Sequence, residues 1–139
     1  MAYDRNNVFA KILRGELPAA KIYEDERTLA FMDAMPQTTG HSLVIPKIEA
    51  ENILDLDPEH LANLVKVTQR LARAVNAALH PDGIRVMQFT GAASGQSVFH
   101  VHFHVMPCYI GQEMKGHARE FADPAVLAEL AKKIKAEMK

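Results

Sequence analysis

Three histidines stand at every second position in one stretch of the chain: His100, His102 and His104. Imidazole has an unperturbed pKa of about 6.5, so near neutral pH it can act as a nucleophile, exchange protons or bind a metal. Because successive side chains of a β-strand point to opposite faces, this spacing predicts a strand that presents three imidazoles on one face. The residues predicted for its buried face are apolar: Phe99, Val101, Phe103 and Val105.

Zinc binding is the main alternative chemistry for such a row. Same-face residues of a strand lie about 6.5–7 Å apart at Cα, so two adjacent histidines could share one Zn²⁺ ion, whereas the outer two, about 13 Å apart, could not. A third ligand would have to come from elsewhere, and His41 is the best candidate. The spread of the three imidazoles suits an extended phosphate group better than a single ion.

The sequence around these histidines resembles a known signature. Residues 96–106 are similar to the His-φ-His-φ-His-φ-φ motif of the histidine-triad (HIT) nucleotide hydrolases and transferases, and in particular of their nucleoside phosphoramidase branch. The resemblance continues through residues 30–47 and back to residues 9–19, and so covers most of residues 7–107.

The resemblance implies catalytic roles for four histidines. His102, the middle member, would attack phosphorus and form a covalent nucleotidyl-histidine that water resolves, with a backbone carbonyl holding its second nitrogen. His104 would bind the phosphate oxygens. His100 and His41 would orient the row.

The resemblance also implies a set of substrate-binding residues. Phe9 and Ile12 would form one wall of the base pocket, although in most proteins such a pair is simply core. By this resemblance, Asp33 would accept hydrogen bonds from the ribose hydroxyls. The residue pattern alone is also consistent with an aspartate that only caps the following turn. Ser97, with the region of Gln96, would serve the phosphate and the leaving group.

This chain departs from the usual family pattern at three places. Many relatives carry a Cys-x-x-Cys metal clip where this sequence has Asn7 and Ala10, so we expect no metal or other cofactor to be required. Phe89 stands where relatives usually have Asn or Gln, and Cys108 where they often have Arg. These two departures leave open whether a P–N or a P–O–P bond is cleaved.

We therefore expect an enzyme that attacks the α-phosphate of a purine nucleoside phosphoramidate or dinucleoside polyphosphate and releases a nucleoside monophosphate. Two alternatives remain at this stage. One is a nucleotide-binding regulatory or scaffold protein with little turnover. The other is a zinc-dependent hydrolase, which the absence of the cysteine pair disfavours.

The composition limits the partners and the location. The formal net charge of −1 does not favour nucleic acid or an acidic membrane as a partner. No run approaches the roughly 20 apolar residues of a membrane span, and the first residues lack an apolar signal core. The single cysteine, Cys108, excludes an internal disulfide and fits a reducing compartment, so we expect a cytoplasmic protein.

The elements that would position the site can be predicted along the chain. Asp57-Pro58 and Asp123-Pro124 are helix starts, the first leading into a long helix that Pro81 ends. A short helix is expected before Gly15, and a loop over residues 110–122. Strands are expected at residues 20–24, 28–32, 41–45, 84–89 and along the histidine stretch.

Together with the resemblance, these elements predict an α+β fold. We expect a HIT-like antiparallel sheet of about five strands, covered by the long helix, with a short N-terminal helix and a C-terminal helix. The 139 residues, 48% hydrophobic, are the length of one domain, with a core at about 7–107 and a C-terminal extension at about 108–139. Because such a sheet leaves an edge or a face uncovered, and because the family suggests it, we expect a homodimer.

Overall fold

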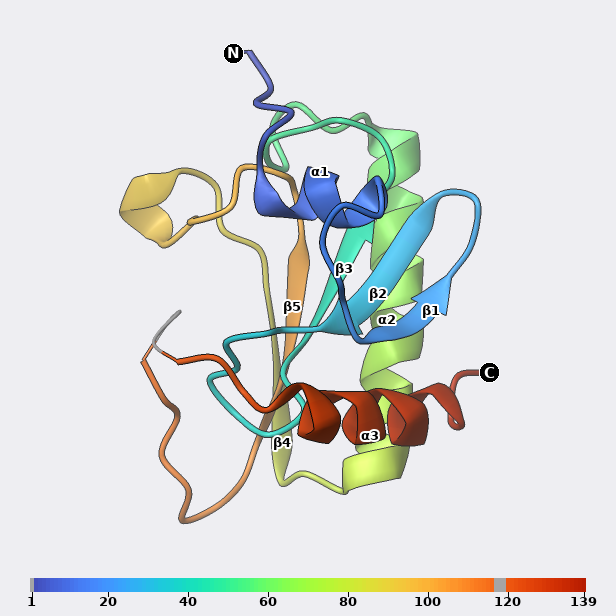
Figure 1. Ribbon diagram of the computed structural model, residues 1–139, viewed down its shortest axis with the longest axis vertical. Helices are drawn as coiled ribbons and strands as arrows, with labels where there is room; N and C mark the ends of the chain where they lie inside the picture. The colour runs from blue at the N-terminus through green and yellow to red at the C-terminus, as the bar shows by residue number, and fades with distance from the viewer. Residues whose placement is uncertain (1, 117–119) are drawn as a thin grey trace.

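The computed structural model describes residues 2–116 and 120–139 (Figure 1). Part of the expected loop, including His117, lies outside the described residues. The helices and strands follow in the order α1 (Val8–Leu13), β1 (Lys21–Glu24), β2 (Thr28–Met32), β3 (Ser42–Pro46), α2 (Pro58–Leu79), β4 (Gly83–Met87), the short 3₁₀ helix η1 (Ala92–Ser94), β5 (Phe103–Cys108) and α3 (Pro124–Lys135).

The strands form one antiparallel sheet, which confirms the expected α+β fold. Its five strands are ordered β1-β2-β3-β5-β4, so β5 lies between β3 and β4. β1 and β4 are the edge strands. The hairpin expected around residues 25–27 joins β1 to β2.

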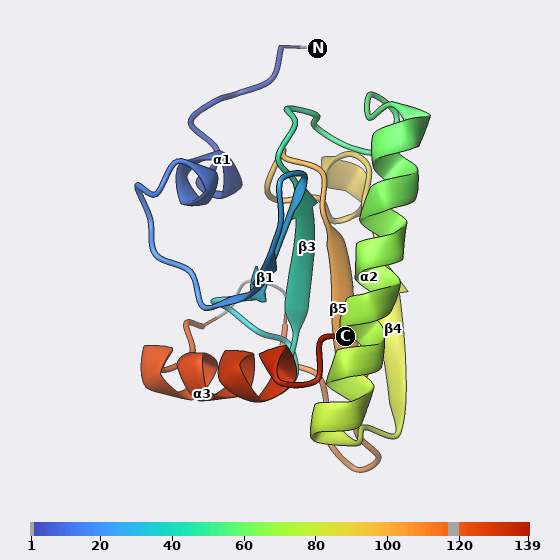
Figure 2. The same ribbon diagram turned by 90° about the vertical axis from the view of Figure 1, so that its right-hand side faces the viewer.

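The helices lie on both sides of this sheet. Figure 2 shows α2 along one face and α1 on the opposite side, while α3 lies across the lower end. β2 and β3 are buried on both faces, and their residues alternate between two apolar clusters. Ala30 and Val44 belong to the cluster beneath α2, whereas Phe31 and Leu43 belong to the cluster beneath α1.

The Asp-Pro pairs begin helices as expected. The side chain of Asp57 accepts a hydrogen bond from the backbone N–H of His60 at the start of α2, and Asp123 accepts one from Ala125 at the start of α3. Such caps satisfy N–H groups that have no partner within the helix. Within the described residues, no helix combines the length and the apolar composition required to cross a bilayer.

The expectation of one strand carrying all three histidines is wrong in its extent. β5 begins at Phe103, so only His104 belongs to the sheet, and residues 97–102 form an irregular segment beside it. The pairing of β3 with β5 ends at Val44↔Phe103. Pro46 has no backbone N–H to continue the ladder, and its carbonyl accepts a hydrogen bond from the ring of His100 instead.

The imidazoles are also not presented on an open face. His100, His102 and His104 are 1%, 6% and 2% exposed, respectively. α1 and the segments before α2 and β5 surround them, so the row lies inside the molecule beside the second apolar cluster.

Candidate active site

One backbone hydrogen bond determines the tautomer of His102. Its Nδ1 lies 2.6 Å from the carbonyl oxygen of His100. A carbonyl can only accept, so Nδ1 carries the proton and the lone pair of the neutral ring is on Nε2. This is the backbone contact that the family resemblance implies for the attacking histidine.

A second chain of contacts determines the tautomers of His41 and His104. The backbone N–H of Gln37 donates to His41 Nδ1 at 3.1 Å, so the proton of His41 is on Nε2. That Nε2 lies 2.9 Å from His104 Nδ1 and 3.4 Å from a carboxylate oxygen of Asp33. His104 therefore accepts at Nδ1 and carries its own proton on Nε2.

The two tautomers give neighbouring rings opposite properties. The rings of His102 and His104 lie 4.9 Å apart between centroids. His102 offers a lone pair on Nε2 and His104 a donor on Nε2, which is the pairing needed to attack an electron-poor centre while stabilising negative charge beside it.

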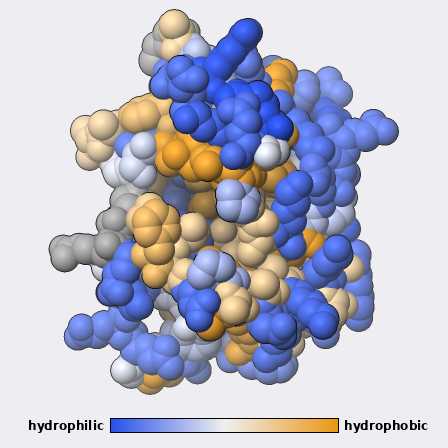
Figure 3. Space-filling model, viewed as in Figure 1, coloured by the Kyte–Doolittle hydropathy of each residue, from blue (hydrophilic) through white to orange (hydrophobic). Residues whose placement is uncertain are grey.

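Phe9 of α1 lies against the row of imidazoles. Its ring meets that of His102 edge to face, 4.8 Å between centroids, and packs against Phe31 on its other side at 5.4 Å. Ile12 belongs to the same apolar cluster. On the face viewed in Figure 1, hydrophobic surface borders a hollow below α1 (Figure 3).

The loop between β4 and β5 is held by Gln96. Its side-chain carbonyl accepts from the N–H of Gly91, and its amide nitrogen donates to the carbonyls of Glu51 and Val98. The amide is thus used to shape the loop and to tie it to the segment before α2. Ser97, the next residue, is exposed.

His100 is held at both ring nitrogens. Nε2–H donates to the carbonyl of Pro46 at 2.8 Å, and Nδ1 lies 2.5 Å from the hydroxyl oxygen of Tyr3. Burial lowers the pKa of His100, while the Pro46 carbonyl and the charge of Glu49 act in the opposite direction. Sequence reasoning missed Tyr3, because nothing in its local pattern points to a residue 97 positions later.

Comparison with known proteins identifies the family. The HIT domain model matches residues 14–110. This chain belongs to the HIT family.

Three relatives illustrate the HIT similarity. A HIT-like protein involved in cell-cycle regulation from Bartonella henselae, solved with an unknown ligand, is 48% identical, with a TM-score of 0.93 and 99% of each chain covered. A zinc-bound histidine triad family protein from Mycobacterium smegmatis is 38% identical, with a TM-score of 0.82, covering 96% of this chain and 93% of that one. Adenylylsulfatase HINT3 from Arabidopsis thaliana is 37% identical over 100 residues, which are 72% of this chain and 51% of HINT3.

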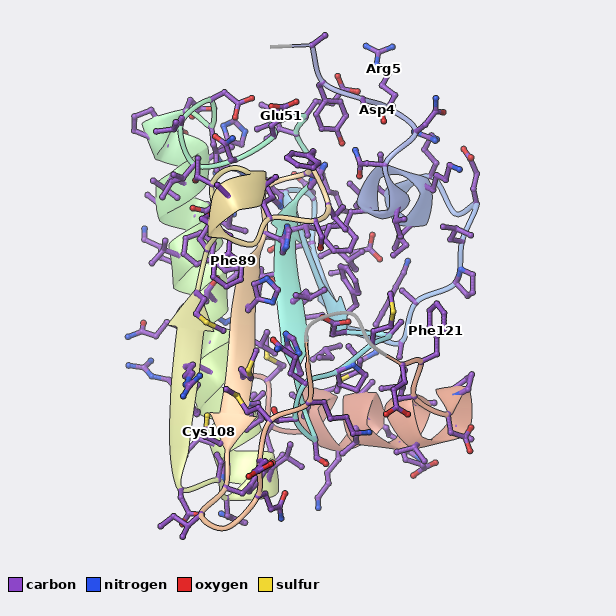
Figure 4. All side chains as sticks on the ribbon, turned by 90° about the vertical axis from the view of Figure 1, so that its left-hand side faces the viewer. Asp4, Arg5, Glu51, Phe89, Cys108 and Phe121 are labelled. Atoms are coloured by element: carbon purple, nitrogen blue, oxygen red, sulfur yellow. The ribbon has the colours of Figure 1, made fainter. Side chains whose placement is uncertain are left out.

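Two of the departures from the HIT pattern lie at opposite ends of β5. Phe89 is beside its upper part and Cys108 at its lower end (Figure 4). The ring of Phe89 lies 5.2 Å from that of His104, so an aromatic wall stands where the family usually has an amide. Gln88 and Thr90 are the polar neighbours of Phe89 in the chain. The amide nitrogen of Gln88 donates to the carbonyl of Phe89, and its amide oxygen accepts from the hydroxyl of Thr90, so both side chains take part in hydrogen bonds within this segment.

One group of side chains in this HIT site could hold a metal by distance alone. Asp33, His41 and His104 offer ligand atoms within 4.8 Å of one another. However, the Gln37 N–H bond leaves the proton on His41 Nε2, the atom that faces the other two. A metal would have to displace that proton, so the observed hydrogen bonds suit a proton-bearing network better than a metal centre.

Proposed function

We propose that this HIT protein is a nucleotide hydrolase or transferase in which His102 attacks the α-phosphorus of a purine nucleoside phosphoramidate or dinucleoside polyphosphate. The observation that carries the proposal is the bond from His102 Nδ1–H to the carbonyl of His100, which places the lone pair of the neutral ring on Nε2, the nitrogen that attacks in this proposal. The HIT family, whose members bind nucleotides and include hydrolases and transferases of them, provides the coarser frame.

The proposed reaction has two displacements at phosphorus. In the first, His102 Nε2 forms a P–N bond while the bond to the leaving group breaks, and the leaving group takes up a proton from solvent. In the second, the oxygen of a water molecule bonds to phosphorus, the P–N bond to His102 breaks and the nucleoside monophosphate is released, while a proton of that water passes to solvent. His104 Nε2–H donates to a phosphate oxygen, where negative charge is greatest in the transition state.

The remaining site residues bind the nucleotide in this proposal. Phe9 and Ile12 form an apolar wall for the base, and a carboxylate oxygen of Asp33 accepts from the ribose. Residues 91–97 face the phosphate and the leaving group, with Gln96 holding the loop in shape and Ser97 adding a hydroxyl.

A panel of substrates tests the proposal and identifies the bond cleaved. Purified protein is incubated in parallel with adenosine phosphoramidate, diadenosine triphosphate, diadenosine tetraphosphate and, because HINT3 is an adenylylsulfatase, adenylyl sulfate. We expect AMP release from at least one of them. Binding without AMP release from any member would favour a nucleotide-binding regulatory or scaffold protein.

His102→Ala provides the residue-level test. Removing a covalent nucleophile leaves only binding and positioning, so AMP release should fall by at least about a thousandfold while the protein stays folded. Acid-labile nucleotidyl adduct should appear on His102 of the wild type when it is quenched during turnover. His80→Asn is the matched control, because His80 is exposed at the end of α2; equal activity in His102→Ala and this control would reject the nucleophile.

The proposal requires no metal. AMP release should survive exhaustive treatment with EDTA, since the hydrogen-bond network already gives His102 and His104 their roles. Loss of activity on chelation, with recovery on addition of Zn²⁺, would support the zinc-dependent alternative instead.

We further propose that the protein works as a cytoplasmic homodimer. The single cysteine, Cys108, supports a reducing compartment. Among the described residues no strand pairs with the outer edge of β4, and this edge supports self-association because an exposed strand edge is a ready surface for pairing.

A further inference from the structure

Tyr3 lies in the segment before α1 and contacts a residue of the histidine triad. Its hydroxyl oxygen is 2.5 Å from His100 Nδ1, and the two rings meet edge to face at 5.6 Å between centroids. Figure 4 shows this N-terminal segment, with Asp4 and Arg5 labelled, above the triad end of the sheet.

The direction of this hydrogen bond follows from the other nitrogen of the ring. His100 Nε2 must donate to the carbonyl of Pro46, so in the neutral ring Nδ1 accepts and the Tyr3 hydroxyl donates. Burial lowers the pKa of His100 and raises that of Tyr3. Both changes favour the neutral forms in which this donor and acceptor match.

His100 in turn supplies the carbonyl that holds His102. Residues 97–102 lie outside the sheet, so no strand ladder fixes this carbonyl. Separate bonds hold the segment instead, among them Val101 N–H to the Ala50 carbonyl at 2.8 Å, the Gln96 amide to the Val98 carbonyl, the His100 ring to Pro46, and the Tyr3 hydroxyl to the His100 ring. Loss of one such bond should therefore shift the His100 carbonyl and, with it, the orientation of the His102 ring.

The segment that carries Tyr3 is anchored to the start of α1. The side-chain amide of Asn7 donates to the carbonyl of Asp4 at 2.7 Å, and its oxygen caps α1 by accepting from the N–H of Ala10. Asn7 and Ala10 are the positions at which many relatives carry the Cys-x-x-Cys clip. Here a turn held by hydrogen bonds occupies this place and presents Tyr3 to the triad.

We propose that Tyr3 is a positioning residue of the active site: it donates to His100 Nδ1 and thereby holds the His100 carbonyl where it orients the ring of His102. This inference rests on the proposed role of His102. It predicts that the rate of attack by His102, measured as kcat, depends on the hydroxyl group of Tyr3, whereas nucleotide binding does not.

Tyr3→Phe tests this role because it keeps the ring and removes only the donor. We expect kcat to fall about fivefold to tenfold, the effect of one net hydrogen bond, with KM within about twofold of wild type. Tyr109→Phe is the matched control, since the Tyr109 hydroxyl donates to the Thr39 carbonyl at an exposed position. An unchanged kcat, or a rise in KM alone, would overturn the positioning role.

A second readout does not depend on activity. Long-range ¹H–¹⁵N spectra of the imidazole rings should show His100 as the Nε2–H tautomer, with an Nδ1 shift that changes in Tyr3→Phe and not in Tyr109→Phe.

The two readouts separate this inference from the proposed function. If His102→Ala kept its activity, the nucleophile would be wrong even with the Tyr3–His100 bond present in the spectra. If His102→Ala were inactive but the His100 signals were the same in wild type and Tyr3→Phe, the inference about Tyr3 would be wrong and the proposed function would stand.

Discussion

Asp33 uses its two carboxylate oxygens differently. Oδ1 accepts a hydrogen bond from the backbone N–H of Met35 at 2.8 Å, which caps the turn after β2. Oδ2 lies 3.4 Å from His41 Nε2, and the side chain is 18% exposed. Turn capping and ribose binding are alternatives from the residues alone, but a carboxylate has enough lone pairs for both.

Variants of Asp33 can separate these two roles. Wild-type protein should prefer a ribonucleotide over its 2′-deoxy analogue by about ten- to a hundredfold in kcat/KM, nearer the lower value because the carboxylate is partly solvated. Asp33→Ser keeps a side-chain oxygen for the turn and should lose most of this preference with a nearly unchanged melting temperature.

Asp33→Ala is the matched comparison. It should lose the same preference and also melt at a lower temperature, because the Met35 N–H loses its partner. Measurement of kcat/KM for both sugars and a melting curve for each protein separate the roles. An unchanged sugar preference in both variants would show that Asp33 only caps the turn.

At the scale of elements, the connection into β3 brings Gly40 against the end of α2. Gly40, the residue before His41, has φ 95°, in the left-handed region. A Cβ at this position would lie 2.3 Å from Cδ1 of Leu79 and 3.0 Å from Cγ of Pro107. The close packing of three elements therefore requires glycine here.

Gly40→Ala should destabilise the protein more than Gly15→Ala. Gly15 also has a left-handed φ, 77°, but a Cβ there meets nothing within 4 Å. We expect a loss of about 1–2 kcal/mol for Gly15→Ala from backbone strain, and about 1–3 kcal/mol more for Gly40→Ala from overpacking. Urea unfolding measures both, and equal losses would mean that Leu79 and Pro107 move aside at little cost.

At the scale of the whole molecule, the two edges of the sheet differ in their surroundings. α3 packs on the β1 side of the sheet, whereas β4 is largely exposed. Val86 of β4 is 50% exposed at this edge. The β4 edge is therefore the surface that a second copy of the chain would cover in the proposed homodimer.

Light scattering with size exclusion tests the homodimer. At micromolar concentration the mass should be twice the 15.4 kDa of one chain. Val86→Lys should shift the protein toward monomer, because a charge on an edge strand opposes pairing. Leu54→Lys is the control, since Leu54 is 78% exposed in the segment before α2 and should not alter the mass; a monomeric wild type would reject the assembly.

The residue pattern alone predicts much of this protein. The helix starts at Asp57-Pro58 and Asp123-Pro124, the first hairpin and the spacing of the three histidines depend on local backbone preferences, which adjacent residues determine. The signature around His102 is likewise local. These features predict the element order, the α+β class and the family.

Only the tertiary structure decided how the histidines are held. The tautomer of each ring depends on which carbonyl or N–H lies against each nitrogen, and those partners are Gln37 for His41, Pro46 and Tyr3 for His100, and the His100 carbonyl for His102. Several are distant in sequence; Tyr3 and His100 are 97 positions apart. The extent of β5 was decided in the same way, because a strand continues only as far as its neighbour can pair, and here the neighbour ends at a proline.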